Sequence, residues 1–215
     1  MKVIITGVTG MVGEGVLFEC LENPIVTQVL MINRRSYDKK HLKLKELIVK
    51  DFSKLSEFSD QLKGYDGCFY CAGVSSVGMD EKKFTELTYD VVVSFAKVLS
   101  DLNPNMVFDY VSGTRTDSSE KGKVMWARVK GRTENALMKL PFKKVYNFRP
   151  DVMKASKGQV NIKTIYKILG PVVGLLYPAK TLPLKDVGIA MINTVSKNNP
   201  KQILEIDDID QLSKL

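Results

Sequence analysis

Two residues in the second half of the chain have types and spacing that suit chemistry on a shared surface. Trp126, the only tryptophan, precedes Lys130 by four residues in the stretch VMWARVKGRTENAL. On an α-helix this spacing brings both side chains to one face. The indole can stack on a flat ring and donate one hydrogen bond, and the ammonium can donate to hydroxyl groups or anions. The pair is therefore either part of a binding site or ordinary helix packing.

A glycine-rich turn follows the first apolar run of the chain. Gly7, Gly10 and Gly13 occur in the order G-x-x-G-x-x-G within VIITGVTGMVGEGVL. Glycine permits a tight turn and lets the backbone approach a pyrophosphate, whose charge then faces free N–H groups at the start of a helix. Because a strand pattern precedes the turn and a helix pattern follows it, the sequence predicts a dinucleotide-binding site. The alternative is that these glycines serve only the turn and helix packing.

The end of the second predicted strand carries an amide and two arginines. An NAD-binding site usually has Asp or Glu at this point, about 20 residues after the turn, to bind the ribose hydroxyls. This chain has INRRS, with Asn33, Arg34 and Arg35. An amide does not repel a phosphate, and guanidinium groups suit the 2′-phosphate of NADP. The sequence therefore favours NADP(H) over NAD(H), with two solvated loop arginines as the alternative.

Residues that bind metals or form redox centres are few. Cys68 and Cys71 are spaced C-x-x-C, but residues three apart on a strand point to opposite faces, which predicts buried small side chains rather than a reactive pair. His41, the only histidine, lies in a polar basic segment without a cluster of cysteines or carboxylates. No metal site is predicted, and a histidine-based catalytic triad is excluded.

The composition suits one folded domain. The chain has 215 residues, 44% of them hydrophobic, and a single domain is predicted over residues 1–215. Its net charge is +8, but the cations are scattered, so no nucleic-acid partner is predicted. The first apolar run breaks without a cleavage site, and three cysteines make no disulfide framework, which predicts a cytoplasmic location. The stretch 168–178 is shorter than the ~20 residues that cross a bilayer, so no transmembrane segment is predicted. Attachment of 167–180 to a membrane surface is an alternative.

Short apolar runs alternate with longer segments of helical period, which is typical of a doubly wound parallel sheet with helices on both faces. Strands are predicted at 2–6, 27–33, 46–50, 67–71, 106–111, 145–148 and 202–205. Helices are predicted at 10–22, 53–62, 80–102, 122–140 and 184–197, with a terminal helix after Asp207. The connection 34–45 is short and basic, so that crossover is predicted without a full helix. Residues 149–183, rich in Gly, Pro and Lys, are predicted to form an inserted lid or substrate segment.

Several stretches resemble motifs of the short-chain dehydrogenase/reductase superfamily, in particular its atypical, epimerase-like members with an NADP-binding Rossmann domain. The likeness carries motifs from Met1 to about Leu140 and is looser beyond. The similar stretches are TGVTGMVG, KDFS, YCAGVSS, YVSGT and NFRPDVM. The resemblance implies a Rossmann α/β fold whose cofactor contacts are Gly7, Thr9, Gly10, Met11, Val12, Gly13, Asn33, Arg34, Arg35, Asp51, Phe52, Cys71, Ala72, Gly73, Val74, Lys130, Arg149 and Pro150.

The resemblance also implies catalytic roles. Ser112 is the residue at the position of the superfamily's catalytic serine, and Lys130 is the residue expected to hold the nicotinamide ribose hydroxyls. The tyrosine that normally precedes the lysine by four residues is replaced by Trp126. A phenol moves a proton to or from the substrate carbonyl, whereas an indole N–H does not titrate in a useful range. Trp126 is therefore expected to be a wall of the pocket. Other groups that could supply the proton are Tyr110, Thr114 and Asp117.

Two functions remain open from the sequence. The first is an NADP(H)-dependent oxidoreductase or epimerase/dehydratase-like enzyme acting on a small carbonyl or hydroxyl compound, which retention of Ser112 and Lys130 favours. The second is a non-catalytic NADP(H)-binding redox sensor or regulatory protein, which Trp126 favours. The predicted helices 80–102 and 122–140 would match the two-helix interface of homodimers in the superfamily; the alternative is a monomer in which the same faces are exposed to solvent.

Overall fold

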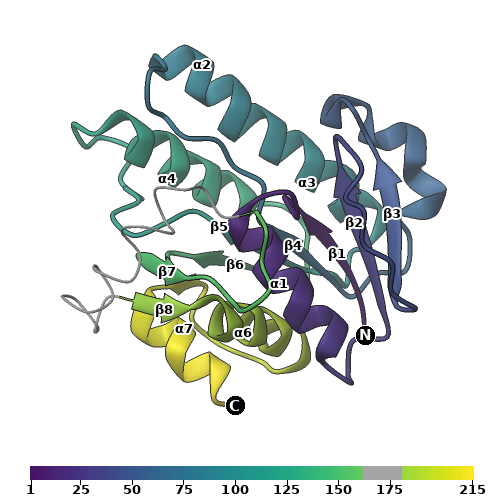
Figure 1. Cartoon of the computed structure of the whole chain (residues 1–215). Helices are drawn as coiled ribbons and strands as arrows, with labels where there is room; N and C mark the ends of the chain where they lie inside the picture. Colours follow the sequence, from purple (N-terminus) through teal and green to yellow (C-terminus); the bar gives the residue numbers. More distant parts are fainter. Residues whose placement is uncertain (162–180) are drawn as a thin grey trace.

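A parallel sheet runs through the residues that this computed structural model describes, which are 1–161 and 181–215 (Figure 1). Its seven strands follow the order β3-β2-β1-β4-β5-β6-β9. They are β1 (Lys2–Thr6), β2 (Gln28–Asn33), β3 (Leu44–Ile48), β4 (Gly67–Tyr70), β5 (Val107–Val111), β6 (Lys144–Phe148) and β9 (Ile203–Leu204). The strand order reverses between β1 and β4, which places a switch point at the carboxyl ends of these two strands.

The inner strands are buried on both faces, as β2 illustrates. Val29 and Met31 belong to the hydrophobic core on one side of the sheet, and Leu30 and Ile32 belong to the core on the other side. Consecutive side chains of a strand point to opposite faces, so an unbroken apolar run requires cover on both sides. The sequence pattern therefore leads directly to a sheet between two layers of helices.

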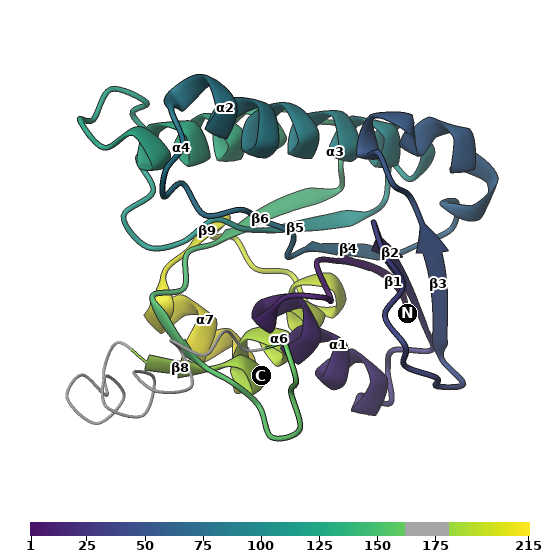
Figure 2. The same cartoon turned by 45° about the horizontal axis from the view of Figure 1, so that its top comes forward.

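Those two layers are separate in Figure 2. One layer consists of α1 (Met11–Glu22), α6 (Leu184–Ser196) and α7 (Ile206–Ser213). The opposite layer consists of η1 (Phe52–Gln61), α2 (Glu81–Thr85), η2 (Glu86–Asp90), α3 (Val91–Leu102) and α4 (Met125–Leu137). This arrangement confirms the predicted doubly wound α/β fold. The β2–β3 crossover contains no helix, as the short basic connection predicts.

Some element boundaries and types differ from the prediction. β3 begins and ends two residues earlier than the predicted 46–50. The predicted α-helix at 53–62 is a 3₁₀ helix, in which the Asp51 side chain accepts from the Ser53 N–H and Phe58 has non-helical dihedral angles. The predicted helix 80–102 changes to π geometry at Glu86–Asp90.

The predicted helix 122–140 is shorter at both ends, since α4 begins at Met125 and ends at Leu137. At its start, the Gly122 N–H donates to the Asp117 carboxylate at 2.7 Å. This hydrogen bond holds Gly122 in the preceding loop. The boundary was therefore decided by a loop contact that helical periodicity does not show.

The predicted lid at 149–183 lies partly outside the described residues, and the stretches 168–178 and 167–180 lie wholly outside them. Its described part contains β7 (Val152–Lys154), which pairs in parallel with β8 (Thr181–Pro183); neither strand was predicted. Residues 159–161 contact the start of α1, where the Gln159 side-chain amide donates to the Met11 carbonyl at 2.6 Å. Residues 159–161 therefore pack against the first turn of the helix that follows the glycine-rich turn.

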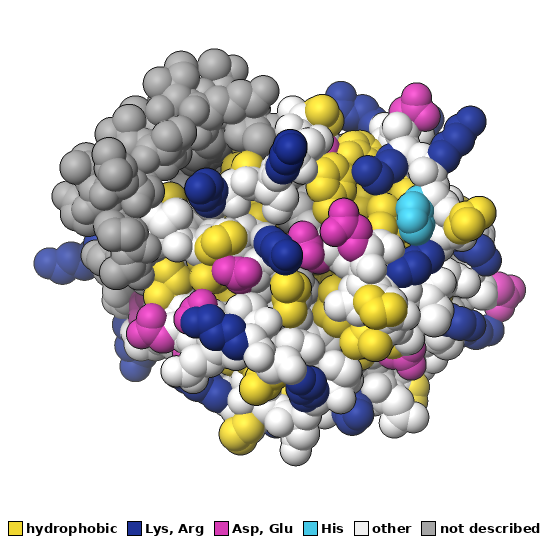
Figure 3. All heavy atoms as spheres, turned by 60° about the horizontal axis from the view of Figure 1, so that its bottom comes forward, with side chains coloured by type: hydrophobic (Ala, Val, Ile, Leu, Met, Phe, Trp, Pro, Cys, Tyr) yellow, Lys and Arg dark blue, Asp and Glu magenta, His cyan; other side chains and the backbone are white. Residues whose placement is uncertain are grey.

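Basic side chains are dispersed over one face of the molecule. On the face drawn in Figure 3, lysines and arginines stand singly between acidic and apolar side chains. The positive net charge therefore does not form one continuous patch on this face. Within the described ranges, no helix combines the length and apolarity needed to cross a membrane.

Candidate functional site

A cleft of about 440 Å³ opens at the carboxyl ends of β1, β2, β3 and β4. In open α/β sheets, ligands bind outside the carboxyl ends of the strands at the point where the strand order reverses. The cleft is lined by Gly7, Thr9, Gly10, Ile32, Asn33, Arg34, Arg35, Lys50, Asp51, Phe52, Tyr70, Cys71, Ala72, Gly73, Val74, Leu87 and Val91. The structure thus brings together predicted cofactor residues from four separate segments of the chain.

The glycine turn requires the absence of side chains at two positions. Gly7 has a φ of +74°, and a Cβ there would lie 2.6 Å from the Ala72 nitrogen. A Cβ on Gly13 would lie 2.3 Å from the Gly7 carbonyl oxygen. Gly10 is the N-cap of α1 and provides no side-chain cap for its N–H groups. A backbone cradle at an uncapped helix N-terminus fits the diphosphate of a dinucleotide.

Cationic side chains surround the other end of the cleft. Asn33 is buried at the end of β2, and Arg34 and Arg35 follow it as exposed residues. Lys50, which sequence reasoning missed as a site residue, lines the same cleft. It directly precedes the predicted cofactor residue Asp51. Its position beside a strand end could therefore have identified it as a site residue. No carboxylate occupies the end of β2, where ribose hydroxyls would be bound.

Asp51 and Phe52 are held by contacts within their own segment. The Asp51 carboxylate accepts from the hydroxyl and the N–H of Ser53, at 2.8 and 3.0 Å. These hydrogen bonds lower the pKa of Asp51 below its ordinary value, so the group stays charged at neutral pH. The Phe52 ring lies 5.2 Å from the Phe95 ring. Both residues are therefore fixed where they line the cleft.

The residues implied as catalytic lie beyond this cleft. Ser112 follows β5 and is 4% exposed, and its hydroxyl lies 2.5 Å from Oε1 of Glu134. The Lys130 ammonium donates to the Ser112 carbonyl oxygen. Burial lowers the pKa of Lys130, and the nearby Glu134 partly opposes this shift. Trp126 is half-buried in the first turn of the same helix, so helical spacing places it one turn before Lys130.

Glu134 is a functional candidate that sequence reasoning missed. It has no exposed surface, and its two carboxylate oxygens accept from Nε and Nη2 of Arg149 at 3.0 and 2.5 Å. Arg149 also contacts Ser118 at 2.6 Å and Glu205 at 3.2 Å. Burial opposes the charge of Arg149, but these carboxylates raise its pKa. The signal for Glu134 was its position one helical turn after Lys130.

Arg149 and Pro150, which were predicted to contact the cofactor, do not line the cleft and instead make contacts within the fold. The Arg149 guanidinium is committed to its carboxylate partners, and the Pro150 carbonyl accepts from the Thr114 N–H at 3.0 Å. Met11, Val12 and Gly13 lie in the first turn of α1, behind the glycine turn, and do not line the cleft either.

Two of the three proposed substitutes for the missing tyrosine, Tyr110 and Asp117, are engaged elsewhere. Tyr110 is 2% exposed, and burial raises its pKa far above the ordinary range. The Asp117 carboxylate accepts from the Ser119 hydroxyl at 2.6 Å, which with the Gly122 N–H lowers its pKa. Asp117 therefore organises its own loop. Neither residue is arranged as a proton donor for a substrate in the cleft.

Cys68 and Cys71 point to opposite sides of the sheet, as predicted, because Cys68 belongs to one hydrophobic core and Cys71 packs against the other. Burial raises the pKa of both thiols well above the usual value, so they stay protonated. His41 is exposed, and its Nδ1 accepts from the Lys43 N–H at 3.2 Å. Across residues 1–161 and 181–215, no three His, Cys, Asp or Glu side chains are grouped to hold a metal ion.

The chain is similar in sequence to a known protein family and to individual proteins. A sequence profile described as the NAD dependent epimerase/dehydratase family matches residues 3–137. The chain is 28% identical over 154 residues to protein HTATIP2 of Rattus norvegicus, a match that covers 71% of this chain and 62% of that protein. The match therefore spans less than two thirds of that relative's length.

Two solved structures are similar over nearly the whole chain. MoeE5 in complex with UDP-glucuronic acid and NAD has a TM-score of 0.70 at 15% identity, covering 96% of this chain and 76% of its own. The carbonyl reductase Sniffer of D. melanogaster has a TM-score of 0.67 at 15% identity, covering 97% of this chain and 96% of its own. At these identities the likeness shows the common fold.

Proposed function

Because the chain belongs to the NAD dependent epimerase/dehydratase family, within the NAD(P)-binding short-chain dehydrogenase/reductase superfamily, we propose an NADP(H)-dependent enzymatic function. The substrate class is a small carbonyl or hydroxyl compound, and the reaction is that of an oxidoreductase or an epimerase/dehydratase. The preference for NADP(H) over NAD(H) rests on the charges at the end of β2. The end of β2 presents Arg34 and Arg35 beside Lys50 in the cleft, without a carboxylate at that strand end.

Different residues of the cleft would hold different parts of the cofactor. The N–H groups at the start of α1 would bind the diphosphate, and the guanidinium groups of Arg34 and Arg35 would bind the 2′-phosphate. Asp51 and Phe52 would flank the adenine, and Ala72, Gly73 and Val74 would lie beside the nicotinamide ribose. When bound, the nicotinamide accepts or supplies a hydride.

The Ser112 region supplies the groups nearest to the reaction. The Lys130 ammonium donates to the Ser112 carbonyl oxygen and would use its remaining N–H groups to hold the ribose hydroxyls. Trp126 would form a wall of the substrate pocket. In this structure the Ser112 hydroxyl donates its hydrogen bond to the Glu134 carboxylate. To polarise a substrate oxygen, Ser112 turns this proton from Glu134 toward the substrate. Without a phenol at position 126, the proton transfer that accompanies hydride transfer is slower than in tyrosine-bearing relatives.

The cofactor assignment is tested by direct binding. Dissociation constants for NADPH and NADH are measured with the wild-type protein and with a double Arg34→Ser, Arg35→Ser variant. The wild type is expected to bind NADPH more tightly, and the variant to lose about tenfold or more in NADPH affinity, since each charge-assisted contact contributes ~1.5–3 kcal/mol. Affinity for NADH is expected to change little. Tighter binding of NADH by the wild type contradicts the assignment.

A second candidate function is a non-catalytic NADP(H)-binding sensor of cofactor redox state. Trp126 and the engagement of Ser112 with Glu134 favour it, since both reduce the capacity for proton transfer. NADPH oxidation is measured with a panel of aldehydes, ketones and quinones. Steady turnover of any compound contradicts the sensor function. Absence of turnover, together with clearly different affinities for NADP⁺ and NADPH, contradicts the enzymatic function.

A further inference from the structure

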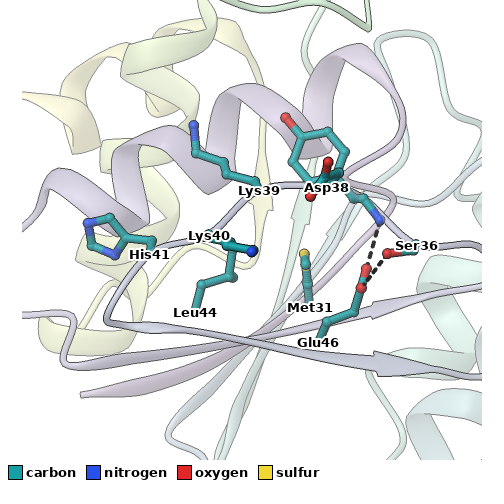
Figure 4. A pocket seen from close by; sticks show the side chains of 9 residues that line it. Met31, Ser36, Asp38, Lys39, Lys40, His41, Leu44 and Glu46 are labelled. Atoms are coloured by element: carbon teal, nitrogen blue, oxygen red, sulfur yellow. Dashed lines mark hydrogen bonds between the residues drawn. The ribbon is translucent and has the colours of Figure 1, made fainter.

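The segment that carries Arg34 and Arg35 lies over a second cavity. This cavity of about 390 Å³ is lined by Met31, Ser36, Tyr37, Asp38, Lys39, Lys40, His41, Leu44 and Glu46. Figure 4 shows Met31, Leu44 and Glu46 on the sheet side and Lys39, Lys40 and His41 on the loop side. The β2–β3 crossover has no helix here, so contacts of the loop's own residues must hold it in place. Tyr37 packs against the hydrophobic core, and the Lys39 ammonium lies 4.1 Å from the centre of the Phe18 ring. Hydrogen bonds hold the residues on either side of Arg34 and Arg35.

Glu46 of β3 provides those hydrogen bonds on both sides of the two arginines. Its carboxylate accepts from the Asn33 side-chain amide at 3.2 Å, from the Ser36 hydroxyl at 2.7 Å and from the Tyr37 N–H at 2.8 Å. The contact between Glu46 and Ser36 is drawn as a dashed line in Figure 4. One carboxylate thus ties the residue before Arg34 to the two residues after Arg35.

These donors also favour the charged form of Glu46. Partial burial disfavours the charged form, but the donors from Tyr37, Ser36 and Asn33 outweigh it and lower the pKa of Glu46 below its ordinary value. A bare negative charge near a phosphate site would weaken phosphate binding. A carboxylate that orders the phosphate-binding segment would strengthen it. The two effects have opposite signs, so they can be separated by experiment.

Tyr37 gives the segment a second attachment. Its hydroxyl donates to Oε1 of Glu14 at 2.8 Å. Glu14 lies in the first turn of α1, has no exposed surface, and also accepts from the Val160 and Asn161 N–H groups at 3.0 and 2.8 Å. Tyr37 therefore joins the loop to the helix whose N-terminus faces the cofactor cleft.

We propose that Glu46 is a positioning residue for cofactor specificity, which holds residues 33–37 in the conformation that presents Arg34 and Arg35 to the 2′-phosphate of NADP(H). This role rests on the NADP(H) preference proposed above. It concerns affinity for NADP(H) alone, because NAD(H) lacks the 2′-phosphate that the two arginines would bind. Glu46 itself is not among the residues that line the cofactor cleft.

The test compares Glu46→Ala with Glu46→Gln and with Asp38→Ala. The glutamine keeps an acceptor oxygen but loses the charge, and Asp38 is an exposed carboxylate of the same loop. Dissociation constants for NADPH and NADH are measured for each protein. Glu46→Ala is expected to weaken NADPH binding about tenfold, because Arg34 and Arg35 would no longer be held in place for charge-assisted contacts with the 2′-phosphate. Its dissociation constant for NADH is expected to stay within about twofold of the wild-type value. Glu46→Gln is expected to restore most of the NADPH affinity, and Asp38→Ala to weaken neither cofactor.

Three results overturn the proposal. They are stronger NADPH binding by Glu46→Ala, unchanged NADPH binding, and equal weakening of both cofactors. If Glu46→Ala does not fold, Ser36→Ala removes one donor at an exposed position and is expected to weaken NADPH about threefold, with NADH unchanged. Unchanged NADPH binding by Ser36→Ala then overturns the proposal.

Failure of this proposal is distinguishable from failure of the proposed function. If the wild type does not prefer NADPH, the NADP(H) assignment itself fails. If the wild type prefers NADPH and the double arginine variant loses that preference while Glu46→Ala keeps it, only the role of Glu46 fails.

Discussion

The hydroxyl of Ser112 lies 2.5 Å from Oε1 of Glu134, a carboxylate with no exposed surface. This contact joins the end of β5 to the middle of α4, and the salt bridge between Glu134 and Arg149 extends it to the residue after β6. A buried ion pair is strongly destabilising when one partner is removed, because the other charge is left without compensation. The contact therefore bears on stability as well as on the state of the serine.

Replacing Glu134 with alanine is expected to lower the free energy of unfolding by about 3–5 kcal/mol, since it leaves the Arg149 guanidinium without its bidentate partner. Urea denaturation measures this change. Glu81→Ala is the control, because the Arg128–Glu81 pair has 24% and 50% exposed side chains. A pair of this exposure contributes about 0–1 kcal/mol. Equal losses in the two variants would contradict the structural role of Glu134.

Replacing Trp126 with tyrosine is expected to increase reductase activity. The substitution puts a phenol one helical turn before Lys130, and general acid–base assistance is typically worth about 10²–10⁴ in rate. NADPH oxidation with a carbonyl panel measures the gain. Trp126→Phe is the matched control, as it changes the ring without adding a proton donor. A similar activity in both variants would show that the phenol does not reach the reacting atom.

Replacing Gly13 with alanine is expected to disrupt the glycine turn, because the new Cβ would lie 2.3 Å from the Gly7 carbonyl oxygen. Overpacking of this kind typically costs about 1–3 kcal/mol of stability. Thermal unfolding with and without NADPH reports both the loss of stability and the loss of cofactor stabilisation. Gly73→Ala serves as the stability control, because a Cβ there meets no atom within 4 Å. A normal response to NADPH in Gly13→Ala is the contrary outcome.

Replacing Asp109 with asparagine is expected to stabilise the protein at neutral and higher pH. Asp109 has no exposed surface, and burial raises its pKa well above the ordinary value despite the 2.7 Å contact from Thr194. The native carboxyl therefore keeps a proton that the unfolded chain releases above a pKa of about 3.9. By linkage, its contribution to stability is fully present below that pKa and is lost as the pH rises through the raised native pKa.

Asparagine resembles the neutral acid and does not titrate. Urea unfolding at pH 4 and pH 8 should therefore show an advantage of Asp109→Asn over the wild type that grows with pH. The exposed Asp101→Asn should show no such growth. An advantage that is equal at both pH values would contradict the pKa shift.

Local sequence features were sufficient for the sheet and much of the cleft. The glycine turn, Asn33 and Ala72 each lie directly beside a strand end, and the ends of parallel strands meet at one edge of a sheet. Once the alternation of apolar runs indicates that sheet, these residues must converge. The same reasoning predicted that Cys68 and Cys71 would separate, because strand periodicity is also a local property.

Other relationships depend on contacts between distant segments. Glu134 is separated by 22 residues from Ser112 and by 15 from Arg149. The helical pattern of α4 puts Glu134 one turn after Lys130, but it does not indicate these two partners. Similarly, Glu46 binds Asn33 because the register of β2 and β3 brings their side chains together. The sequence by itself determined the fold and the chemistry available at each strand end. Only the tertiary structure decided which buried donors and acceptors are paired, since such pairing requires the packed positions of several elements at once.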